Sequence, residues 1–261
     1  MSFAEPLERR MRVRFGGEWI ADSENVLLLH EPSRLPVAYF PIDDLTRGVL
    51  NPSDRRTSHQ DFGTTAWYDA RTAAVSARDA AYRHTNPPAH ARELQDRVAF
   101  VWSAMESFFE EDDQIFGHAT DPYHHIDVRQ ADRRLTVRAG DRLVAATRRP
   151  LVLYESGFAP RWYVPTDDVD INTLTPTADR TFSPYKGFCT YYTVLGRCGA
   201  AWSYENPPPD ARRIAGLLSF EPGHLEVRLD DTILGPEPET TIPLGLADPR
   251  LPGEQTPGRL S

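Results

Sequence analysis

EPSRLPVAYFPIDD at residues 31–44 returns as ESGFAPRWYVPTDD at residues 155–168, and this repetition decides the fold. The offset of 124 residues (155 − 31) relates residues 13–69 to residues 137–193 without a gap. Farther along, the offset falls to 120 (206 − 86), because Asn86-Pro87-Pro88 returns as Asn206-Pro207-Pro208. The chain is therefore a tandem duplication of one small domain, and we expect one hairpin loop to differ between the copies by four residues (124 − 120).

Short alternating or β-branched runs separated by turn residues dominate each copy, as in Met11–Phe15, Leu135–Arg138 and Phe188–Val194. Such runs are typical of β-strands. Proline pairs precede short stretches in which a helix is expected, because proline is tolerated at a helix start. The sequence predicts a mainly β (α+β) fold of two tandem copies of a small β-sheet domain with short helices, the copies being related by a pseudo-two-fold axis.

The repeat also predicts the domain boundaries. We expect a first repeat at residues 10–117, a connector at 118–134, a second repeat at 135–232 and a loosely ordered, Pro/Gly/Thr-rich tail at 233–261. Residues 101–111 have no evident counterpart in the second copy. Their large apolar side chains recur at helical spacing, which predicts an apolar helix that packs the two copies together. These side chains are Trp102, Met105, Phe108 and Phe109.

Composition excludes several classes of function. The 261 residues carry a net charge of −9 without a basic stripe, which argues against nucleic acid as a partner. Neither a signal peptide nor an apolar run of roughly 20 residues is recognisable, so we expect a cytoplasmic protein without a membrane partner. Cys189 and Cys198 are expected to be reduced thiols flanking one hairpin turn. The duplication is compatible with a monomer or a homodimer.

The only lysine of the chain is Lys186, in Ser183-Pro184-Tyr185-Lys186-Gly187 of the second copy, and its partner in the first copy is Phe62. A bias that replaced surface lysines by arginine would leave such a residue by chance. The alternative is that an amine is needed there, because lysine can lose its proton when buried and attack a carbonyl, whereas arginine stays charged.

Aromatic residues surround this lysine in the predicted hairpin. Gly187 allows a close turn, and strand alternation then places Cys189 and Tyr191 on one face. The partner strand contributes two more aromatic side chains. The predicted substrate-binding residues are Arg161, Tyr163, Cys189, Tyr191, Trp202 and Tyr204. The alternative is that these aromatic residues are ordinary cross-strand pairs of the sheet.

Histidines and acidic pairs raise the question of a metal. His124 and His125 point to opposite faces of an extended segment, and no zinc-binding spacing is present, so no metal site is predicted. His124 is instead a candidate acid or base between the repeats. Asp167-Asp168 follows a proline, where acidic residues serve in turns, although carboxylates also bind magnesium. No pattern identifies a cofactor.

Four motifs carry a family resemblance: Asp121-Pro122-Tyr123-His124, Leu153-Tyr154-Glu155-Ser156-Gly157, Tyr163-Val164-Pro165 and Pro184-Tyr185-Lys186-Gly187. Over about residues 10–232 the chain resembles the tandem form of the domain-of-unknown-function 427 family, sometimes labelled nucleotidyltransferase-like. The resemblance implies a mainly β fold and no established activity. The first copy reads Gln60-Asp61-Phe62-Gly63 at the last motif, so a site built on that motif is expected once. Ser183 stands where family members often have cysteine.

Two classes of function follow, each with a small-molecule ligand as partner. One is an enzyme for isomerisation, cyclisation or carbonyl chemistry, in which Lys186 is an electrophilic stabiliser, a base or a Schiff-base former and Tyr185 or His124 moves a proton. The other is a non-catalytic binding or scaffolding module. Metal-dependent nucleotidyl transfer at Asp167-Asp168 is a further alternative. The sequence leaves enzyme and binding module open.

Overall fold

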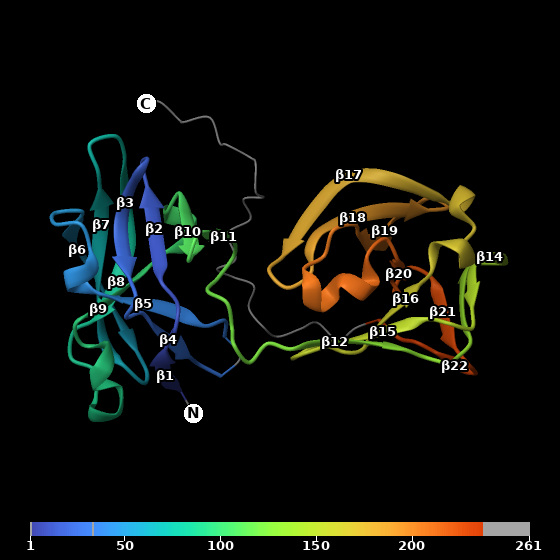
Figure 1. Cartoon of the computed structure of the whole chain (residues 1–261), viewed down its shortest axis with the longest axis horizontal. Coiled ribbons are helices and arrows are strands. Elements are labelled where there is room, and N and C mark those ends of the chain that lie inside the picture. Colours follow the sequence, from blue (N-terminus) through green and yellow to red (C-terminus); the bar gives the residue numbers. More distant parts are fainter. Residues whose placement is uncertain (1, 33, 237–261) are drawn as a thin grey trace. The chain divides into compact units, whose positions relative to one another are not determined.

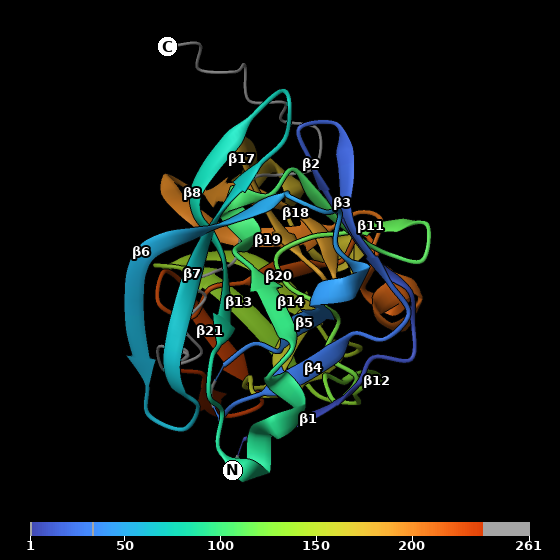
Figure 2. The same cartoon turned by 90° about the vertical axis from the view of Figure 1, so that its left-hand side faces the viewer.

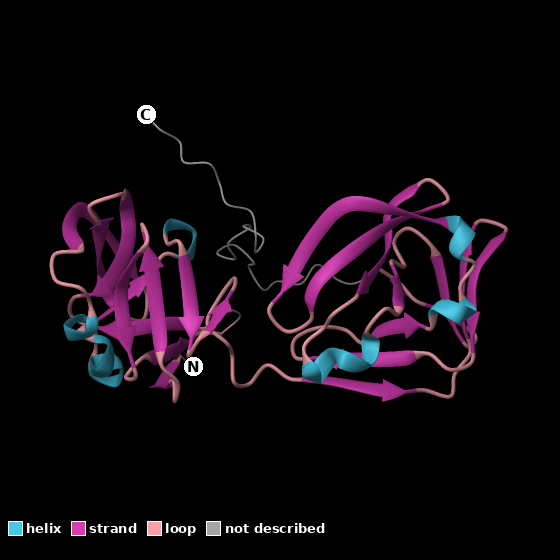
Figure 3. Ribbon diagram, turned by 45° about the horizontal axis from the view of Figure 1, so that its top comes forward, coloured by secondary structure: helices cyan, strands magenta, loops and turns pink. Residues whose placement is uncertain are grey.

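Each repeat folds into a seven-stranded and a four-stranded antiparallel sheet (Figures 1 and 3). The computed structural model describes residues 2–32 and 34–236. The predicted mainly β fold of two tandem copies with short helices is confirmed. The two structural units divide between Asp121 and Pro122. Within the described residues, no helix has the length and apolar character needed to cross a membrane.

The first repeat begins its large sheet at the third residue. In spatial order this sheet contains β1 (Phe3–Pro6), β4 (Leu27–His30), β5 (Val37–Pro41), β9 (Arg97–Phe100), β8 (Ser76–His84), β7 (Gly63–Arg71) and β6 (Leu50–His59). The small sheet contains β11 (Asp113–Ile115), β10 (Ser107–Glu110), β2 (Met11–Phe15) and β3 (Glu18–Ser23). Three short 3-10 helices complete it: η1 (Ile42–Asp44), η2 (Ala89–Leu94) and η3 (Trp102–Ala104). Figure 2 shows β6, β7 and β8 as long neighbouring ribbons.

The second repeat has the same strand order. Its large sheet contains β12 (Ile126–Gln130), β15 (Leu151–Glu155), β16 (Arg161–Val164), β20 (Leu218–Phe220), β19 (Arg197–Tyr204), β18 (Gly187–Val194) and β17 (Leu174–Ser183). The small sheet contains β14 (Arg142–Thr147), β13 (Leu135–Ala139), β21 (Glu226–Leu229) and β22 (Thr232–Ile233). Its short helices are η4 (Thr166–Asp168), η5 (Ile171–Thr173) and η6 (Pro209–Ile214).

Apolar side chains lie on both faces of each large sheet. The inner face packs against the small sheet, as in the cluster that joins Leu135 and Val137 to Phe220. The outer face is covered in part by a short helix, since Ala211 and Ile214 of η6 pack with its residues. Strand alternation therefore gives two cores per repeat. The site described below lies on the outer face.

The predicted difference in hairpin length is confirmed. Strands β7 and β8 with their turn span Gly63–His84, which is 22 residues (84 − 63 + 1), whereas β18 and β19 span Gly187–Tyr204, which is 18 (204 − 187 + 1). Four extra residues therefore lie in the first hairpin. Both cysteines belong to the shorter hairpin, and both are free thiols, Cys189 buried and Cys198 exposed.

The predicted apolar helix at residues 101–111 is wrong. Only η3 is helical there, and β10 follows it and pairs with β2, Phe108 standing opposite Val13. Burial alternates along β10, with Phe108 and Glu110 buried and Ser107 and Phe109 partly exposed, so a two-residue period prevails over the apparent helical spacing. The segment has a counterpart in β21, and its buried side chains lie in the first repeat's own core.

The repeat boundaries also shift. Strand β1 lies before residue 10, and β12, inside the predicted connector, belongs to the second repeat's large sheet. Ile233, placed in the predicted tail, is part of β22. The edge strands β1, β12 and β22 have only 4, 5 and 2 residues, too few to show the longer alternation by which a sequence reveals a strand. The rest of the predicted loose tail, residues 237–261, lies outside the described residues.

Candidate functional site

Lys186 lies in the tight turn between β17 and β18. The hydroxyl of Ser183 accepts hydrogen bonds from the backbone N–H groups of Tyr185 and Lys186, at 3.3 and 3.2 Å. Gly187 follows with φ +83°, and a Cβ atom there would lie 3.3 Å from the carbonyl oxygen of Asn206. Glycine is favoured at such positive φ and at such close backbone approach. The turn is thus seated against the segment that precedes η6, which orients the lysine side chain.

The Lys186 side chain ends a buried chain of polar groups. Its Nζ donates a hydrogen bond to Oε2 of Glu155, at the end of β15. Nε2 of His124 lies 3.1 Å from the other carboxylate oxygen of Glu155. The Tyr185 ring stacks on the His124 imidazole, with centroids 3.6 Å apart. Exposed fractions of 14% for Lys186, 7% for Glu155 and 12% for His124 show that all three are largely withdrawn from water.

The carboxylate of Glu155 keeps its charge in this environment. Burial by itself raises the pKa of Glu155, but the hydrogen bond with His124 and the positive charge of Lys186 more than compensate. The net effect lowers the pKa below the ordinary value of a glutamate. At neutral pH the chain therefore contains an ionised carboxylate that holds an ammonium group in a fixed direction.

A cavity of about 310 Å³ opens beside this chain. Six of the residues predicted for the site line it. These are Arg161, Tyr163, Lys186, Tyr191, Trp202 and Tyr204. The cavity volume is at the lower end of the range for small-molecule sites, and the mixture of aromatic and charged walls is typical of them.

Two buried tyrosines line the cavity, and a buried thiol packs in the same core cluster. Tyr163 and Tyr204 are 1% and 7% exposed, and burial raises the pKa of both phenols, so they remain neutral hydroxyl groups. Cys189 stands opposite Tyr204 in the β18–β19 ladder and is 1% exposed. Burial also raises the pKa of this thiol. Cys189, predicted as substrate-binding, packs in the outer core with no part in the cavity wall.

The cavity wall carries a second cation, Arg161. The Arg161 guanidinium lies 4.8 Å from the centroid of the Trp202 ring, a cation–π contact. Its Nη1 is 3.8 Å from Oε2 of Glu221, at the end of β20. Tyr191 stands opposite Trp202 in the ladder, and its hydroxyl is 3.0 Å from Oγ1 of Thr181. The cavity wall thus contains two cations, each close to a carboxylate, together with aromatic side chains.

Several residues of the site differ from the prediction. Tyr185 and His124 do not line the cavity; His124 contacts Glu155, and Tyr185 stacks on His124. Glu155, Glu221 and Phe158 line it although the sequence did not indicate them. Glu155 carried a signal, because Glu31 occupies its place in the first copy. Its partners, 31 residues away in either direction, are brought to it only by the fold.

Comparison with known families agrees with this duplicated architecture. A family model described as a domain of unknown function (DUF427) matches residues 3–111 and 127–231, one match for each repeat. The chain belongs to the DUF427 family. No curated protein matches the chain. Both DUF427 segments include the glutamate, so the site can be compared directly between the two repeats.

In the first DUF427 repeat the corresponding place is filled. Phe62, the counterpart of Lys186, is 1% exposed and stacks on His59 with centroids 4.6 Å apart. Nε2 of His59 lies 3.0 Å from Oε1 of Glu31. His59, at the end of β6, therefore pairs with this glutamate. The phenyl ring of Phe62 stands at the sequence position that carries the ammonium group in the second repeat. The first repeat uses this face as core.

Three buried polar side chains of the first DUF427 repeat, Tyr39, Thr65 and His84, are hydrogen-bonded to one another. Nε2 of His84 is 3.0 Å from the Tyr39 hydroxyl, and its Nδ1 is 3.1 Å from Oγ1 of Thr65. Burial, reinforced by the nearby His59, lowers the pKa of His84 to about 4. His84 is the counterpart of Tyr204, so a neutral imidazole replaces a neutral phenol at the same position of the sheet.

The acidic pairs considered as metal ligands serve the turns of both DUF427 repeats. Oδ2 of Asp168 accepts a hydrogen bond from the Thr147 hydroxyl at 2.7 Å and one from Nε of Arg149 at 3.2 Å. In the first repeat, Oδ2 of Asp44 accepts one from the Ser23 hydroxyl at 2.6 Å. The carboxylates therefore tie η1 and η4 to the neighbouring strands β3 and β14.

Proposed function

We propose that the chain is an enzyme acting on a small organic molecule at a single site in the second repeat. The reaction is an isomerisation, cyclisation or related carbonyl chemistry. The observation that carries this proposal is the buried chain from His124 through Glu155 to Lys186, which ends at a cavity of about 310 Å³. A buried ion pair that faces a ligand-sized cavity is costly to maintain for stability alone, which favours a chemical role.

Lys186 is assigned the role of electrophilic stabiliser. An ammonium group has three N–H donors, and one of them is engaged by Glu155. The others are available to an oxygen in the cavity, where they would stabilise negative charge that develops on a carbonyl oxygen. Because the ion pair fixes the side chain, this donor is in place before the substrate binds. Schiff-base formation requires a neutral amine, and the hydrogen-bonded carboxylate of Glu155 favours the charged form instead.

Glu155 and His124 are assigned the proton-handling role. Glu155 lines the cavity and is ionised, so it is the group that would accept a proton from a carbon next to the carbonyl. His124 holds the other carboxylate oxygen, and the stacked Tyr185 ring restricts the imidazole. Across the cavity, Arg161 and Trp202 suit a planar ligand that carries a carboxylate.

Metal-dependent nucleotidyl transfer has less support. Its proposed ligands, Asp167 and Asp168, lie in η4, where Asp168 is occupied by Thr147 and Arg149. Neither aspartate lines the cavity beside Lys186. We therefore centre the proposed function on the lysine.

The test is proton exchange at carbon in D₂O. Phenylpyruvate and benzoylacetate each combine an aromatic ring, a carboxylate and an enolisable carbonyl, and the loss of their α-proton signals is followed by NMR. We expect acceleration by the natural protein and a decrease of about 10²- to 10³-fold in Lys186→Met, the usual effect of removing one oxyanion donor. Arg142→Met is the matched control, because it removes an exposed cation that pairs with Asp170 on the surface.

The outcomes separate the two classes of function. Exchange that depends on Lys186 and not on Arg142 supports the enzyme. Saturable binding of either compound, weakened in Lys186→Met but without accelerated exchange, assigns the site to a binding module. Exchange that Lys186→Met leaves unchanged contradicts the role of the lysine.

A further inference from the structure

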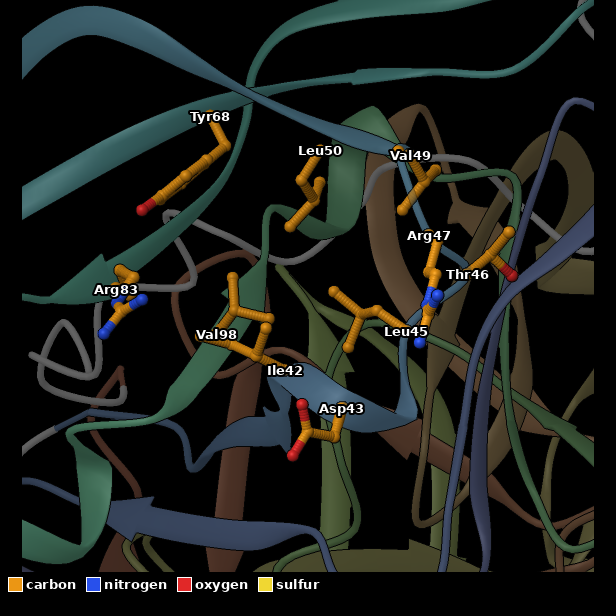
Figure 4. Close-up of a pocket in the computed structure, with 11 residues that line it drawn as sticks. Ile42, Asp43, Leu45, Thr46, Arg47, Val49, Leu50, Tyr68, Arg83 and Val98 are labelled. Carbon is orange, nitrogen blue, oxygen red and sulfur yellow. The ribbon is translucent and has the colours of Figure 1, made fainter.

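A second cavity, of about 490 Å³, lies in the first repeat (Figure 4). Tyr68 of β7, Arg83 of β8 and Val98 of β9 line one side, and the segment 42–50 lines the other. Tyr68 and Val98 belong to the inner core, whereas Phe62 belongs to the outer one. This cavity therefore lies on the opposite face of the sheet from the place that Phe62 fills, and it is unrelated to the lysine site.

Two polar groups in the cavity wall lack protein partners. Nε of Arg83 is buried without a hydrogen bond, although its Nη2 donates to the carbonyl oxygen of Gln95 at 2.7 Å. Tyr68 is only partly buried, and within residues 2–32 and 34–236 its hydroxyl has no hydrogen-bond partner either. A buried donor without an acceptor costs free energy, and native proteins contain few of them. An acceptor supplied by a ligand would satisfy both groups.

In the second repeat, the tyrosine at the corresponding position has a hydrogen-bond partner within the protein. Tyr192, the counterpart of Tyr68, has its hydroxyl 3.3 Å from Oγ of Ser203, which replaces Arg83. Ser203 in turn donates to Glu205 at 2.6 Å. The phenol is therefore satisfied internally in one repeat and left for another partner in the other. Ile171 likewise stands where the first repeat has Arg47.

The lining combines positive charge with an apolar middle. Arg47, Arg83 and Asp43 give the lining a net charge of +1 (2 − 1). Outside the lining, Oδ1 of the exposed Asp96 lies 3.7 Å from Nη2 of Arg83. Figure 4 shows Tyr68 and Arg83 at one end of the cavity and Arg47 at the other. Apolar side chains lie between these ends, namely Ile42, Leu45, Leu50 and Val98. An anionic group at the Tyr68 end and an apolar body along the middle would match this pattern.

We propose that this cavity of the first repeat binds a small carboxylate with an apolar aliphatic or aromatic body. The carboxylate accepts hydrogen bonds from Arg83 and from the Tyr68 hydroxyl, which is the charge-assisted arrangement that arginine favours. The body contacts Leu50 and Val98. The proposal does not depend on the lysine site, because the two cavities share no residue.

The test is calorimetric titration of the full chain with 4-phenylbutyrate, and with 4-phenylbutan-1-ol as the uncharged analogue. We expect saturable binding of the acid, weaker binding of the alcohol, and a roughly 10- to 100-fold rise of Kd in Arg83→Met, the effect of losing a hydrogen bond to a charged group. Tyr68→Phe, the milder change, should raise Kd by a smaller factor. Tyr192→Phe removes the equivalent hydroxyl from the second repeat and should leave Kd unchanged.

Thermal melting verifies that each variant is folded. If Arg83→Met does not fold, the Kd of Tyr68→Phe tests the proposal. Absence of saturable binding, or a Kd that neither variant changes, overturns the proposal. Binding that is lost in Lys186→Met and kept in Arg83→Met places the acid in the second repeat and also overturns it. The two proposals can fail separately. If no Lys186-dependent proton exchange is found but binding still depends on Arg83, the carboxylate site is supported and only the proposed enzyme is rejected.

Discussion

The two repeats place the same glutamate at the end of the same strand and use it differently. In the second repeat, Glu155 holds the ammonium group of Lys186 beside a cavity. In the first, Glu31 is paired with His59, and the Phe62 ring fills the space. The backbone order of the sheets is identical. The turn position held by Lys186 or Phe62 therefore goes with a cavity beside the glutamate in one repeat and with a buried phenyl ring in the other.

The comparison also explains which parts of the motif persist. Gly63 and Gly187 both have positive φ, and a Cβ atom at either would lie close to the carbonyl oxygen of Asn86 or Asn206. The turn geometry is thus shared by the repeat that has phenylalanine in place of the lysine. The glycine that this geometry requires is present in both copies, whereas the lysine is present in one.

Among these variants, Phe62→Ala should have the largest effect on stability. Truncating a fully buried phenylalanine leaves a cavity and costs about 3–5 kcal/mol, so the free energy of unfolding of the first repeat should fall by that amount. Denaturant titration read by NMR signals of β7 measures it. Phe188→Ala, at a side chain that is 43% exposed, is the control and should cost far less. Equal losses would show that Phe62 is not a core residue.

The second-largest expected effect is a difference between the two repeats in how their stability falls with decreasing pH. Unfolded histidine binds a proton near pH 6.5, whereas the pKa of buried His84 is about 4. Between these values the unfolded chain binds more protons, so the first repeat loses stability as the pH falls from about 6.5 to 4, by up to about 3 kcal/mol. The lowered pKa of Glu155 makes its contribution to the second repeat disappear only below pH 4.5.

Urea titrations at several pH values, followed by NMR signals of β8 and β19, measure this difference. His84→Gln, which retains hydrogen-bonding groups for Tyr39 and Thr65, should remove the dependence of the β8 signals above pH 4.5. If β8 and β19 lose stability together over that range, His84 is not the responsible group.

Gly187→Ala should have an intermediate effect. The new side chain meets both the penalty of φ +83° and the Asn206 carbonyl oxygen at 3.3 Å, for a loss of about 1–3 kcal/mol. Gly17→Ala is the matched control, because its φ is +82° and nothing lies within 4 Å of the added Cβ. The difference between the two free energies of unfolding isolates the contact with Asn206. A zero difference would mean that the turn is not seated on that segment.

The smallest predicted effect concerns the acidic turns. Asp168→Asn weakens interactions with Thr147 and Arg149, whereas Asp44→Asn weakens the one with Ser23. We expect a loss of about 1 kcal/mol for the first and less for the second, since the ion pair with Arg149 is exposed. Thermal melting with and without magnesium checks this. A large magnesium-dependent stabilisation lost in Asp168→Asn would revive the metal-site alternative.

The sequence predicts the repeat, the β-sheet character and half of the residues that line the cavity beside Lys186, because a constant offset and strand alternation are local properties. Tyr191 and Trp202 could be placed on facing strands for this reason, and the ladder pairs them. The segment around Phe108 was misread, because its large apolar residues fit a helical period over one short stretch. Pairing with β2, which lies about 95 residues earlier (108 − 13), decides its conformation.

The chemistry was less predictable than the fold. Strand alternation put Cys189 on the cavity face but does not reveal that Tyr163 and Tyr204 shield it, which depends on side-chain packing. The pairing of Glu155 with Lys186 and His124 joins three separate segments, and no spacing in the chain encodes it. The cavity at Arg83 was missed altogether, because a single arginine on a strand resembles an ordinary surface residue.

The most direct test of the central claim uses the fact that Lys186 is the only lysine in the chain. Protein labelled with ¹³C and ¹⁵N in lysine gives side-chain NMR signals from this residue alone. We expect the Nζ signal of the natural protein to be protected from rapid exchange with water and shifted from that of free lysine. In Glu155→Gln, the exchange rate and the chemical shift should both return to those of free lysine. A freely exchanging signal in the natural protein, unchanged by Glu155→Gln, would contradict this expectation.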